Sequence, residues 1–435
     1  MVPTRRFWWL AVLGIPLAGV VAELGFPAWM VAYDLLLLVV AFATSRLAPS
    51  VKGLRLSRVF DSVLSVRTAN KIVVRLENDG VEPVIGRMRD EPPPQYFADQ
   101  REFNVHVQPG RVQEFVYHLT PDERGSEMFY GTFLRLACPL GLVERAIKLN
   151  TEEAIRVYPN VLALREFDLL RQQGRLRELG IRRSRNRGLG SDFESLRDYT
   201  EGDDYRKIDW KASARRAKLV VRQYEQERNQ CVILAIDVGR HMLSEVNGVR
   251  KLDHVLDAIL MLAHAAAAAG DMVGLLVYGD TVKRYIPPKK GRAQIGAVIE
   301  ACHDLVAEPV ESDPNTAFAY LSARWKRRSL LVSFTDYEDE DRARDLATAL
   351  ASVSHRHLTL LTRVMDPRID ELLTAPLVDT SAMYQRGAAT MITADRRKAT
   401  ALITSARIRT LDAEPQDLAA KLVSYYFMVK ERSLL

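Results

Sequence analysis

The chain has 435 residues, of which 48% are hydrophobic and 27% charged, and this composition excludes a disordered or low-complexity protein. Its length predicts two or three domains. The three cysteines lie far apart in the sequence, which excludes a disulfide framework or a zinc site made from cysteines alone and indicates buried thiols in a reducing compartment. The formal net charge of +6 is concentrated rather than general, because much of the surplus comes from one run of arginines: Arg171, Arg175, Arg177, Arg182, Arg183, Arg185 and Arg187.

Residues 1–46 predict a transmembrane helical hairpin. Residues 7–22 carry no charge, Glu23 interrupts the pattern, and a second apolar run follows over 26–43. Each run is close to the minimum needed to cross a hydrocarbon core of roughly 30 Å. Basic residues flank the pair and are missing from the turn, so the positive-inside rule predicts two spans in the plasma membrane with the soluble domains cytoplasmic. Asp34 favours a second helix that is shifted or shallow over one with a polar contact inside the span.

A cleaved signal peptide is the alternative for this segment, since two arginines precede an apolar core and a Val-Val-Ala cleavage sequence. The second apolar run argues against it, because that run would anchor the chain in any case.

Residues 47–160 predict a small antiparallel β-sandwich. Short alternating runs recur at 72–76, 104–107, 115–119 and 129–136, separated by turn residues. His106 and His118 alternate with apolar neighbours, which is typical of outward-facing strand positions. The domain is therefore expected to be a structural or docking module without an active site.

Residues 161–228 combine a basic linker with a dense block of charges of both signs. Single aromatic residues are embedded in this block, which a solvated linker would not need: Phe193, Tyr199, Tyr205, Trp210 and Tyr224. We expect Trp210 and Tyr199 to pack the block onto the following domain. The aspartates Asp203, Asp204 and Asp209 stand beside lysines and arginines, so structural ion pairs are favoured over a hydrolytic centre.

The arginine run between 171 and 190 has no interleaved aromatic residues, so stacking on bases is not supported and no nucleic-acid partner is predicted. Contact with anionic lipid head groups and a solvated loop both stay open for it.

Residues 229–435 predict a doubly wound α/β domain. Apolar strands at 231–236, 272–278, 282–286, 329–335, 357–364 and 408–411 alternate with helices at 249–269, 294–306, 316–325, 341–353 and 416–429. The strands at 231–236 and 329–335 are followed directly by Asp237 and Asp336. Because ligands of open parallel sheets bind at the carboxyl ends of strands, we expect both carboxylates to reach one crevice, where hard oxygen ligands suit Mg²⁺ or Mn²⁺.

The block and its flanks resemble the DUF58 family, most clearly over residues 190–199 and 202–215, with further similarity at 218–222 and Glu225. The positions that carry the resemblance are Gly190, Phe193, Arg197, Tyr199, Gly202, Asp203, Arg206, Asp209, Trp210 and Arg215. The resemblance implies a membrane-anchored prokaryotic protein with a von Willebrand factor A-like domain. It also implies a MoxR-type AAA+ ATPase as partner, because the genes of the two commonly occur together.

The metal site of such domains has the pattern Asp-x-Ser-x-Ser, with a later threonine and a later aspartate. The resemblance carries these roles to Asp237, Thr316 and Asp336, while Gly239 and His241 stand where the serines would be. A bound Mg²⁺ or Mn²⁺ is one interpretation. The other is that Asp237 caps a loop or binds a cation such as Arg240.

From these features we expect an adaptor rather than an enzyme, held in the plasma (inner) membrane of a prokaryote, facing the cytoplasm and binding a MoxR-type ATPase through the A-like domain. Two alternatives stay open. One is a metal-dependent hydrolase using Asp237, Asp336 and His241, and the other is a structural protein of the lipid surface that acts through the arginine run.

Overall fold

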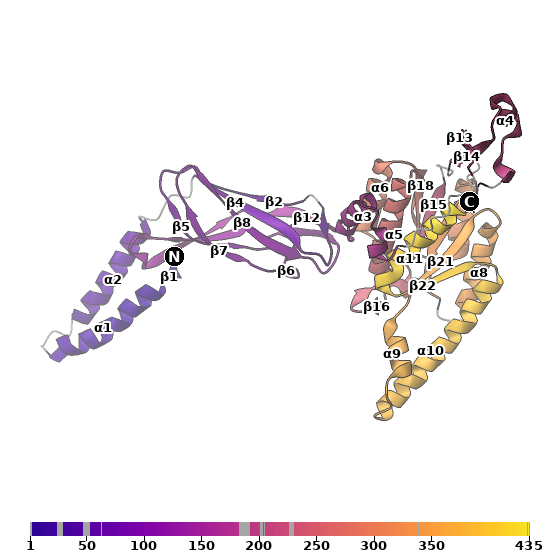
Figure 1. Cartoon of the computed structure of the whole chain (residues 1–435). Coiled ribbons are helices and arrows are strands. Elements are labelled where there is room, and N and C mark those ends of the chain that lie inside the picture. The colour runs from indigo at the N-terminus through magenta and orange to yellow at the C-terminus, as the bar shows by residue number, and fades with distance from the viewer. Residues whose placement is uncertain are drawn as a thin grey trace. The chain divides into compact units, whose positions relative to one another are not determined.

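The computed structural model describes residues 2–23, 29–46, 53–61, 63–181, 192–200, 203, 205–225, 230–337, 340–432 and 434. The chain forms two compact units, residues 1–160 and 161–435 (Figure 1).

The first unit contains helices α1 (Arg5–Glu23) and α2 (Trp29–Arg46) near its N-terminus. Helix α1 begins with two arginines and ends on Glu23, and α2 contains Asp34 and ends on Arg46, so neither offers the about 20 apolar residues that a bilayer core requires. Within the described ranges, no helix combines the length and the apolar composition needed to cross a membrane. The transmembrane hairpin predicted over residues 1–46 is therefore wrong, and so are the two-span membrane partner and the inner-membrane location that rested on it.

The rest of the first unit is built from antiparallel sheets. A four-stranded sheet has the order β2-β4-β8-β6, a five-stranded sheet the order β1-β11-β10-β5-β7, and a small third sheet the order β3-β12-β9, in which only the β3–β12 pair is parallel. The bounds are β1 Val2–Pro3, β2 Leu54–Val59, β3 Leu64–Ser65, β4 Asn70–Asn78, β5 Val84–Asp90, β6 Phe97–Ala98, β7 Glu102–Val107, β8 Arg111–Thr120, β9 Gly125–Phe129, β10 Thr132–Ala137, β11 Val143–Leu149 and β12 Glu153–Tyr158.

Buried and more exposed residues alternate along the strands, and the buried ones form one core between the two larger sheets. In β4 every second residue from Asn70 to Asn78 is buried, so Ile72, Val74 and Leu76 face the side chains of the opposite sheet. His106 and His118 are exposed, as predicted. The sandwich arrangement expected for this region is thus confirmed by the pairing and by the shared core.

One buried ion pair lies inside this apolar core. The Arg58 guanidinium contacts the Asp90 carboxylate, and both side chains are almost fully buried. Asp90 also accepts hydrogen bonds from the hydroxyl groups of Tyr117 and Thr132, each at 2.8 Å. The Arg58 guanidinium lies 4.4 Å from the centroid of the Phe129 ring. The pair therefore connects the two sheets through a fully satisfied polar network.

The second unit contains a six-stranded sheet of order β19-β18-β15-β20-β21-β22, parallel except for the edge strand β19. The strands are β15 Cys231–Asp237, β18 Met272–Tyr278, β19 Val282–Lys289, β20 Leu330–Phe334, β21 Leu358–Val364 and β22 Arg409–Ala413. Every residue of β15 and β20 is buried, as expected for central strands covered on both faces.

Helices cover both faces of this sheet (Figure 1). One core forms with α3 (Leu162–Gln172), α5 (Lys251–Ala268), α6 (Arg292–His303) and α11 (Pro415–Glu431). The other forms with α7 (Pro314–Arg324), α8 (Glu340–Ser354) and α10 (Thr380–Ser405). The doubly wound arrangement predicted for this part of the chain is confirmed.

Shorter elements complete the second unit. The strands β13 and β14 form a two-stranded sheet, and α9 leads into α10. Their bounds, with those of the remaining short elements, are β13 Asp192–Asp198, α4 Trp210–Arg216, β14 Val220–Glu225, β16 Glu245–Val246, β17 Val249–Arg250 and α9 Pro367–Thr374. In the arginine run, Arg171 pairs with Asp168 and Arg175 with Glu178, whereas the arginines at 182, 183, 185 and 187 lie outside the described residues.

His357, just before β21, makes stability depend on pH. Only 3% of it is exposed, and burial, with a smaller contribution from Arg356, lowers the pKa of its imidazole to about 4. In the unfolded chain the imidazole takes up a proton below about 6.5, whereas the folded protein resists protonation down to about 4. The folded state therefore loses stability as the pH falls from 6.5 towards 4.

We expect His357→Asn to remove up to about 2 kcal/mol of the decrease in unfolding free energy between pH 7 and pH 5. Urea unfolding of both proteins at the two pH values measures this difference. Identical pH dependence in the two proteins would show that His357 is not the group responsible.

Candidate functional site

The sheet topology brings Asp237 and Asp336 to the same edge. Strand β15 ends at Asp237, and its neighbour β20 runs parallel to it, with Ile236 opposite Phe334. After β15 the chain proceeds to β18 on one side and later returns to β20 on the other. The ends of β15 and β20 therefore flank the point where the strand order reverses, which is where open sheets of this kind bind ligands.

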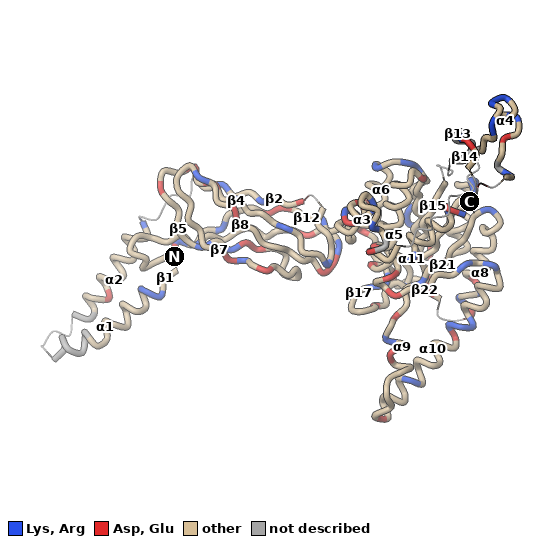
Figure 2. Tube along the Cα trace, viewed as in Figure 1, with Lys and Arg blue, Asp and Glu red and all other residues tan. Residues whose placement is uncertain are grey.

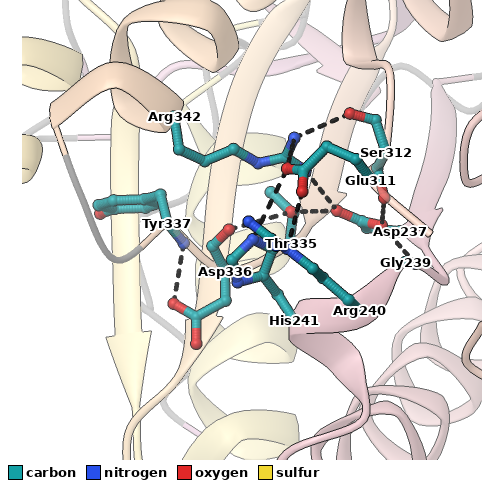
Figure 3. Close-up of polar contacts among 10 residues, drawn as sticks. All are labelled: Asp237, Gly239, Arg240, His241, Glu311, Ser312, Thr335, Asp336, Tyr337 and Arg342. Carbon is teal, nitrogen blue, oxygen red and sulfur yellow. Dashed lines mark hydrogen bonds and ion pairs between the residues drawn. The ribbon is translucent and has the colours of Figure 1, made fainter. Parts of the chain in front are cut away.

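Asp237 is fully buried, and four hydrogen-bond donors surround its carboxylate (Figure 3). One oxygen accepts from the backbone N–H of Gly239 at 2.8 Å and from the Ser312 hydroxyl. The other accepts from the Thr335 hydroxyl and from the Arg342 guanidinium, the latter at 3.3 Å. Because an ionised carboxylate offers about four lone-pair positions, these donors use its full capacity.

The close approach of Ser312 explains why residue 239 is a glycine. A Cβ atom at Gly239 would lie 2.0 Å from the Ser312 hydroxyl oxygen and 2.8 Å from the Val310 carbonyl oxygen. A serine at 239 would therefore displace Ser312 from Asp237. The hydroxyl group that the family pattern places two residues after the aspartate is supplied here from a distant loop.

Arg342, in the first turn of α8, joins the buried carboxylate to the surface. Its guanidinium donates to Asp237, to the Ser312 carbonyl oxygen at 2.8 Å and to the Glu311 carboxylate at 3.0 Å. Glu311 is half-exposed, and its second oxygen lies 2.7 Å from Nε of Arg240. Nε2 of His241 is 3.8 Å from Glu311. A chain of alternating charge thus leads from the sheet edge to solvent.

Asp336 has a different partner. Its carboxylate forms a buried ion pair with Lys251, the first residue of α5, and accepts a 2.9 Å hydrogen bond from the Tyr337 backbone N–H. Figure 3 shows this carboxylate directed towards Tyr337, whereas that of Asp237 faces Gly239 and Ser312. Both strand-end carboxylates are therefore neutralised by cationic side chains of the protein itself.

The carboxylates of Asp237 and Asp336 are not arranged to bind a divalent cation. Mg²⁺ requires several oxygen ligands with free lone pairs, but Asp237 and Asp336 are each in contact with a buried cation. Thr316, the threonine that the resemblance assigns to a metal, instead donates to Asp313, the N-cap of α7, and this hydrogen bond lowers the pKa of Asp313. Among the described residues no cluster of three or more histidine, cysteine or acidic side chains is arranged for a metal ion.

The surroundings are equally unsuited to acid–base chemistry. Tyr278 ends the neighbouring strand β18, and burial, with the adjacent Asp237 charge, raises the pKa of its phenol well above the ordinary value. It therefore stays protonated at neutral pH. His241 contacts Glu311 rather than either aspartate. What the geometry provides is a network of ion pairs with Arg240 and Glu311 at its exposed end.

The structure brings together Asp237, Asp336 and, at the rim, His241, but not Thr316. Sequence reasoning missed the residues that complete the site: Lys251, Glu311, Ser312, Thr335 and Arg342. Only Thr335 carried a signal, because it precedes Asp336 directly at the end of a predicted strand.

The predicted signature residues form a separate group. Arg197 pairs with Asp203, and Asp209 caps α4. Gly190 and Gly202 lie outside the described residues, as does the side chain of Phe193. Tyr199 is half-buried, whereas Arg206, Trp210 and Arg215 are exposed. The prediction that Trp210 packs the block onto the sheet domain is wrong, because 66% of its surface is exposed.

Residues 195–408 match the model of a family described as "Protein of unknown function DUF58". The chain is 25% identical to the uncharacterized protein Rv1480 of Mycobacterium tuberculosis over 187 residues, 42% of this chain and 58% of that protein. It is also 25% identical to the uncharacterized protein YeaD of Bacillus subtilis over 211 residues, 48% of this chain and 49% of that protein. The chain thus spans 58% and 49% of the lengths of these relatives.

Two solved structures are similar at low identity. One is the conserved hypothetical protein BatB of Bacteroides thetaiotaomicron, at 13% identity and a TM-score of 0.32, covering 46% of this chain and 98% of that chain. The other is an aerotolerance-related membrane protein of Bacteroides fragilis, at 12% identity and a TM-score of 0.29, with the same coverage of both chains.

Proposed function

We propose that this chain, which matches the DUF58 family model over residues 195–408, is a protein-interaction adaptor that binds a MoxR-type AAA+ ATPase through the carboxyl edge of its A-like sheet. One observation carries this proposal. Arg342 ties the buried Asp237 to the half-exposed Glu311, so the charge at the sheet edge is held rigidly and is presented to solvent. A pre-organised charged surface favours recognition, because little side-chain entropy is lost on binding.

The chemistry of the rim suggests how the partner is held. Glu311 lies between the Arg240 and Arg342 guanidinium groups, which are cation positions that suit a carboxylate. An acidic side chain of the ATPase would take the place of Glu311 on these two arginines. Binding would then depend on side-chain cations where other A-like domains use a metal.

This proposal predicts opposite effects for two substitutions at the rim. Arg240→Gln removes the more exposed cation, and we expect it to weaken binding of the purified ATPase at least tenfold, as for an interfacial arginine hot spot. Glu311→Gln removes the competing carboxylate, and we expect it to tighten binding several-fold. Biolayer interferometry with the full chain immobilised measures both.

Arg324→Gln is the matched control, because it removes an exposed arginine from the C-terminal end of α7, whereas Glu311 lies just before the N-terminal end of this helix. Arg324 lies over the Tyr320 ring. The affinity of this variant for the ATPase should equal that of the wild type. Equal affinities for the wild type and both rim variants would rule out this edge as the binding surface, and no binding by the wild type would remove the ATPase as partner.

A further inference from the structure

The charged block forms a small structural unit that the proposed function does not use. Strands β13 and β14 pair as an antiparallel hairpin, and α4 lies in the connection between them. We refer to residues 192–225 as the signature hairpin. Its two strands belong to a sheet of their own rather than to the six-stranded sheet.

The signature hairpin is fixed by its own polar contacts. Arg197 donates to both oxygens of Asp203, at 2.7 and 2.6 Å, and the backbone N–H of Thr200 donates to the same carboxylate at 2.9 Å. These donors hold the pKa of Asp203 well below its ordinary value. Asp209 accepts from Ala212 N–H at 2.9 Å and so caps α4. These polar contacts fix the connection between the two strands, and Val220 and Val221 are buried beneath it.

Large apolar side chains are presented on the outside of this scaffold. Trp210 is 66% exposed, Tyr205 67% and Leu219 47%. Tryptophan and tyrosine are the residues most enriched at energetic hot spots of protein interfaces. Lys211, Arg215 and Arg216 are exposed beside them, and Figure 2 shows this positive charge along α4.

Three carboxylates of the hairpin are used internally. Asp203 is paired with Arg197, Asp209 caps α4, and Asp198 pairs with Lys218 at 2.8 Å. Among the described residues, the charged side chains exposed beside Trp210 are the cations Lys211, Arg215 and Arg216. A partner surface complementary to Trp210 and these cations is negative at its rim and apolar at its centre.

We propose that the signature hairpin is a second docking element, which inserts Trp210 and Tyr205 into an apolar pocket on an acidic protein surface. The aromatic rings fill the pocket, and Lys211, Arg215 and Arg216 contact carboxylates around it. Two features favour a protein over single-stranded nucleic acid. The Arg206 guanidinium lies over the Tyr205 ring, 5.8 Å from its centroid, and so takes one stacking face, and the aliphatic Leu219 has no face on which a base could stack.

Photo-crosslinking from position 210 tests this assignment. The full chain is produced in its native host with p-benzoylphenylalanine in place of Trp210, irradiated in the cells, and its adducts are identified by mass spectrometry. We expect an adduct with one defined protein, attached within a segment of net negative charge. The purified form of that protein is then titrated against the wild-type chain and its variants.

Two hairpin variants and one control variant make the titration specific. Trp210→Ala, and separately the combination of Lys211→Gln, Arg215→Gln and Arg216→Gln, are each expected to weaken binding at least tenfold. The combination of Lys289→Gln, Lys290→Gln and Arg292→Gln removes the same number of exposed charges from the β19–α6 region and should leave affinity unchanged. All substituted side chains are exposed, so the fold is retained, which thermal melting verifies.

The possible adducts separate this proposal from its alternatives. An adduct with RNA would overturn it in favour of nucleic-acid binding. An adduct within the chain itself would show that Trp210 packs on its own protein, and the absence of any adduct would show that position 210 meets no partner. Because the rim residues Arg240 and Glu311 lie outside the hairpin, this outcome does not depend on the ATPase proposal.

Discussion

Replacing Lys251 by Met is expected to lower the unfolding free energy of the sheet domain by about 3–5 kcal/mol. Lys251 is buried against Asp336, and methionine keeps most of its volume while removing the charge. The Asp336 carboxylate would remain buried without its cation, and an uncompensated buried charge is strongly destabilising. Chemical denaturation followed by tryptophan fluorescence, through the partly buried Trp325 in the same domain, measures the loss.

The double variant Lys251→Met/Asp336→Leu is the control for this experiment. Because replacing both members of a buried pair with apolar groups is often close to neutral, we expect it to recover most of the lost stability. Adding Mg²⁺ to the Lys251→Met variant tests whether a metal ion can replace the lost lysine charge. A melting temperature restored by Mg²⁺ alone would show that Asp336 accepts a metal once its cation is gone, whereas failure of the double variant to recover would mean that packing, not charge, decides the effect.

Asp90→Ala is expected to lower the unfolding free energy of the first unit by a similar amount, about 3–5 kcal/mol. The substitution leaves the Arg58 guanidinium buried and removes the acceptor for the Tyr117 and Thr132 hydroxyl groups. The Phe129 ring offsets only part of this loss, since its cation–π contact with the Arg58 guanidinium contributes roughly 0.5–2 kcal/mol. Urea unfolding of the full chain, followed by circular dichroism at a β-sheet wavelength, resolves the change.

Glu114→Ala is the matched control, since Glu114 pairs with Arg75 on the four-stranded sheet of the same sandwich but both side chains are about half-exposed. Solvent screens such a pair, and we expect a loss below about 1 kcal/mol. Comparable losses for Asp90→Ala and Glu114→Ala would contradict the assignment of Asp90 as a structural centre of the sandwich.

Apolar periodicity was sufficient to predict most of the sheet domain. The run from Cys231 to Ile236 reads as a central strand because every position is apolar, and each of its residues is buried. Two such strands followed by aspartate correctly placed Asp237 and Asp336 at one edge, since parallel strands end on the same side of a sheet.

The partners of the two aspartates could not be predicted in the same way. Lys251 and Arg342 stand in the first turns of α5 and α8, where a charged residue is normally solvated and carries no signal of burial. Helix α10 was missed because half of its 26 residues are polar or charged, with Gly387 inside and only three buried positions, so no apolar stripe marks it.

The N-terminal prediction failed for the opposite reason. Apolar content between 7 and 43 outweighed the charges that interrupt it, and these charges decide whether a helix of 18 or 19 residues can cross a bilayer. Glu23, Asp34 and Arg46 all fall within the two observed helices.

Hydrogen–deuterium exchange of the full chain with and without the purified ATPase tests the central claim most directly. The proposal predicts slower exchange on binding in the segments that carry the rim, residues 238–243 and 308–313, with the opposite ends of the strands unchanged. Slower exchange elsewhere, with these two segments unaffected, would contradict binding at the carboxyl edge of the sheet.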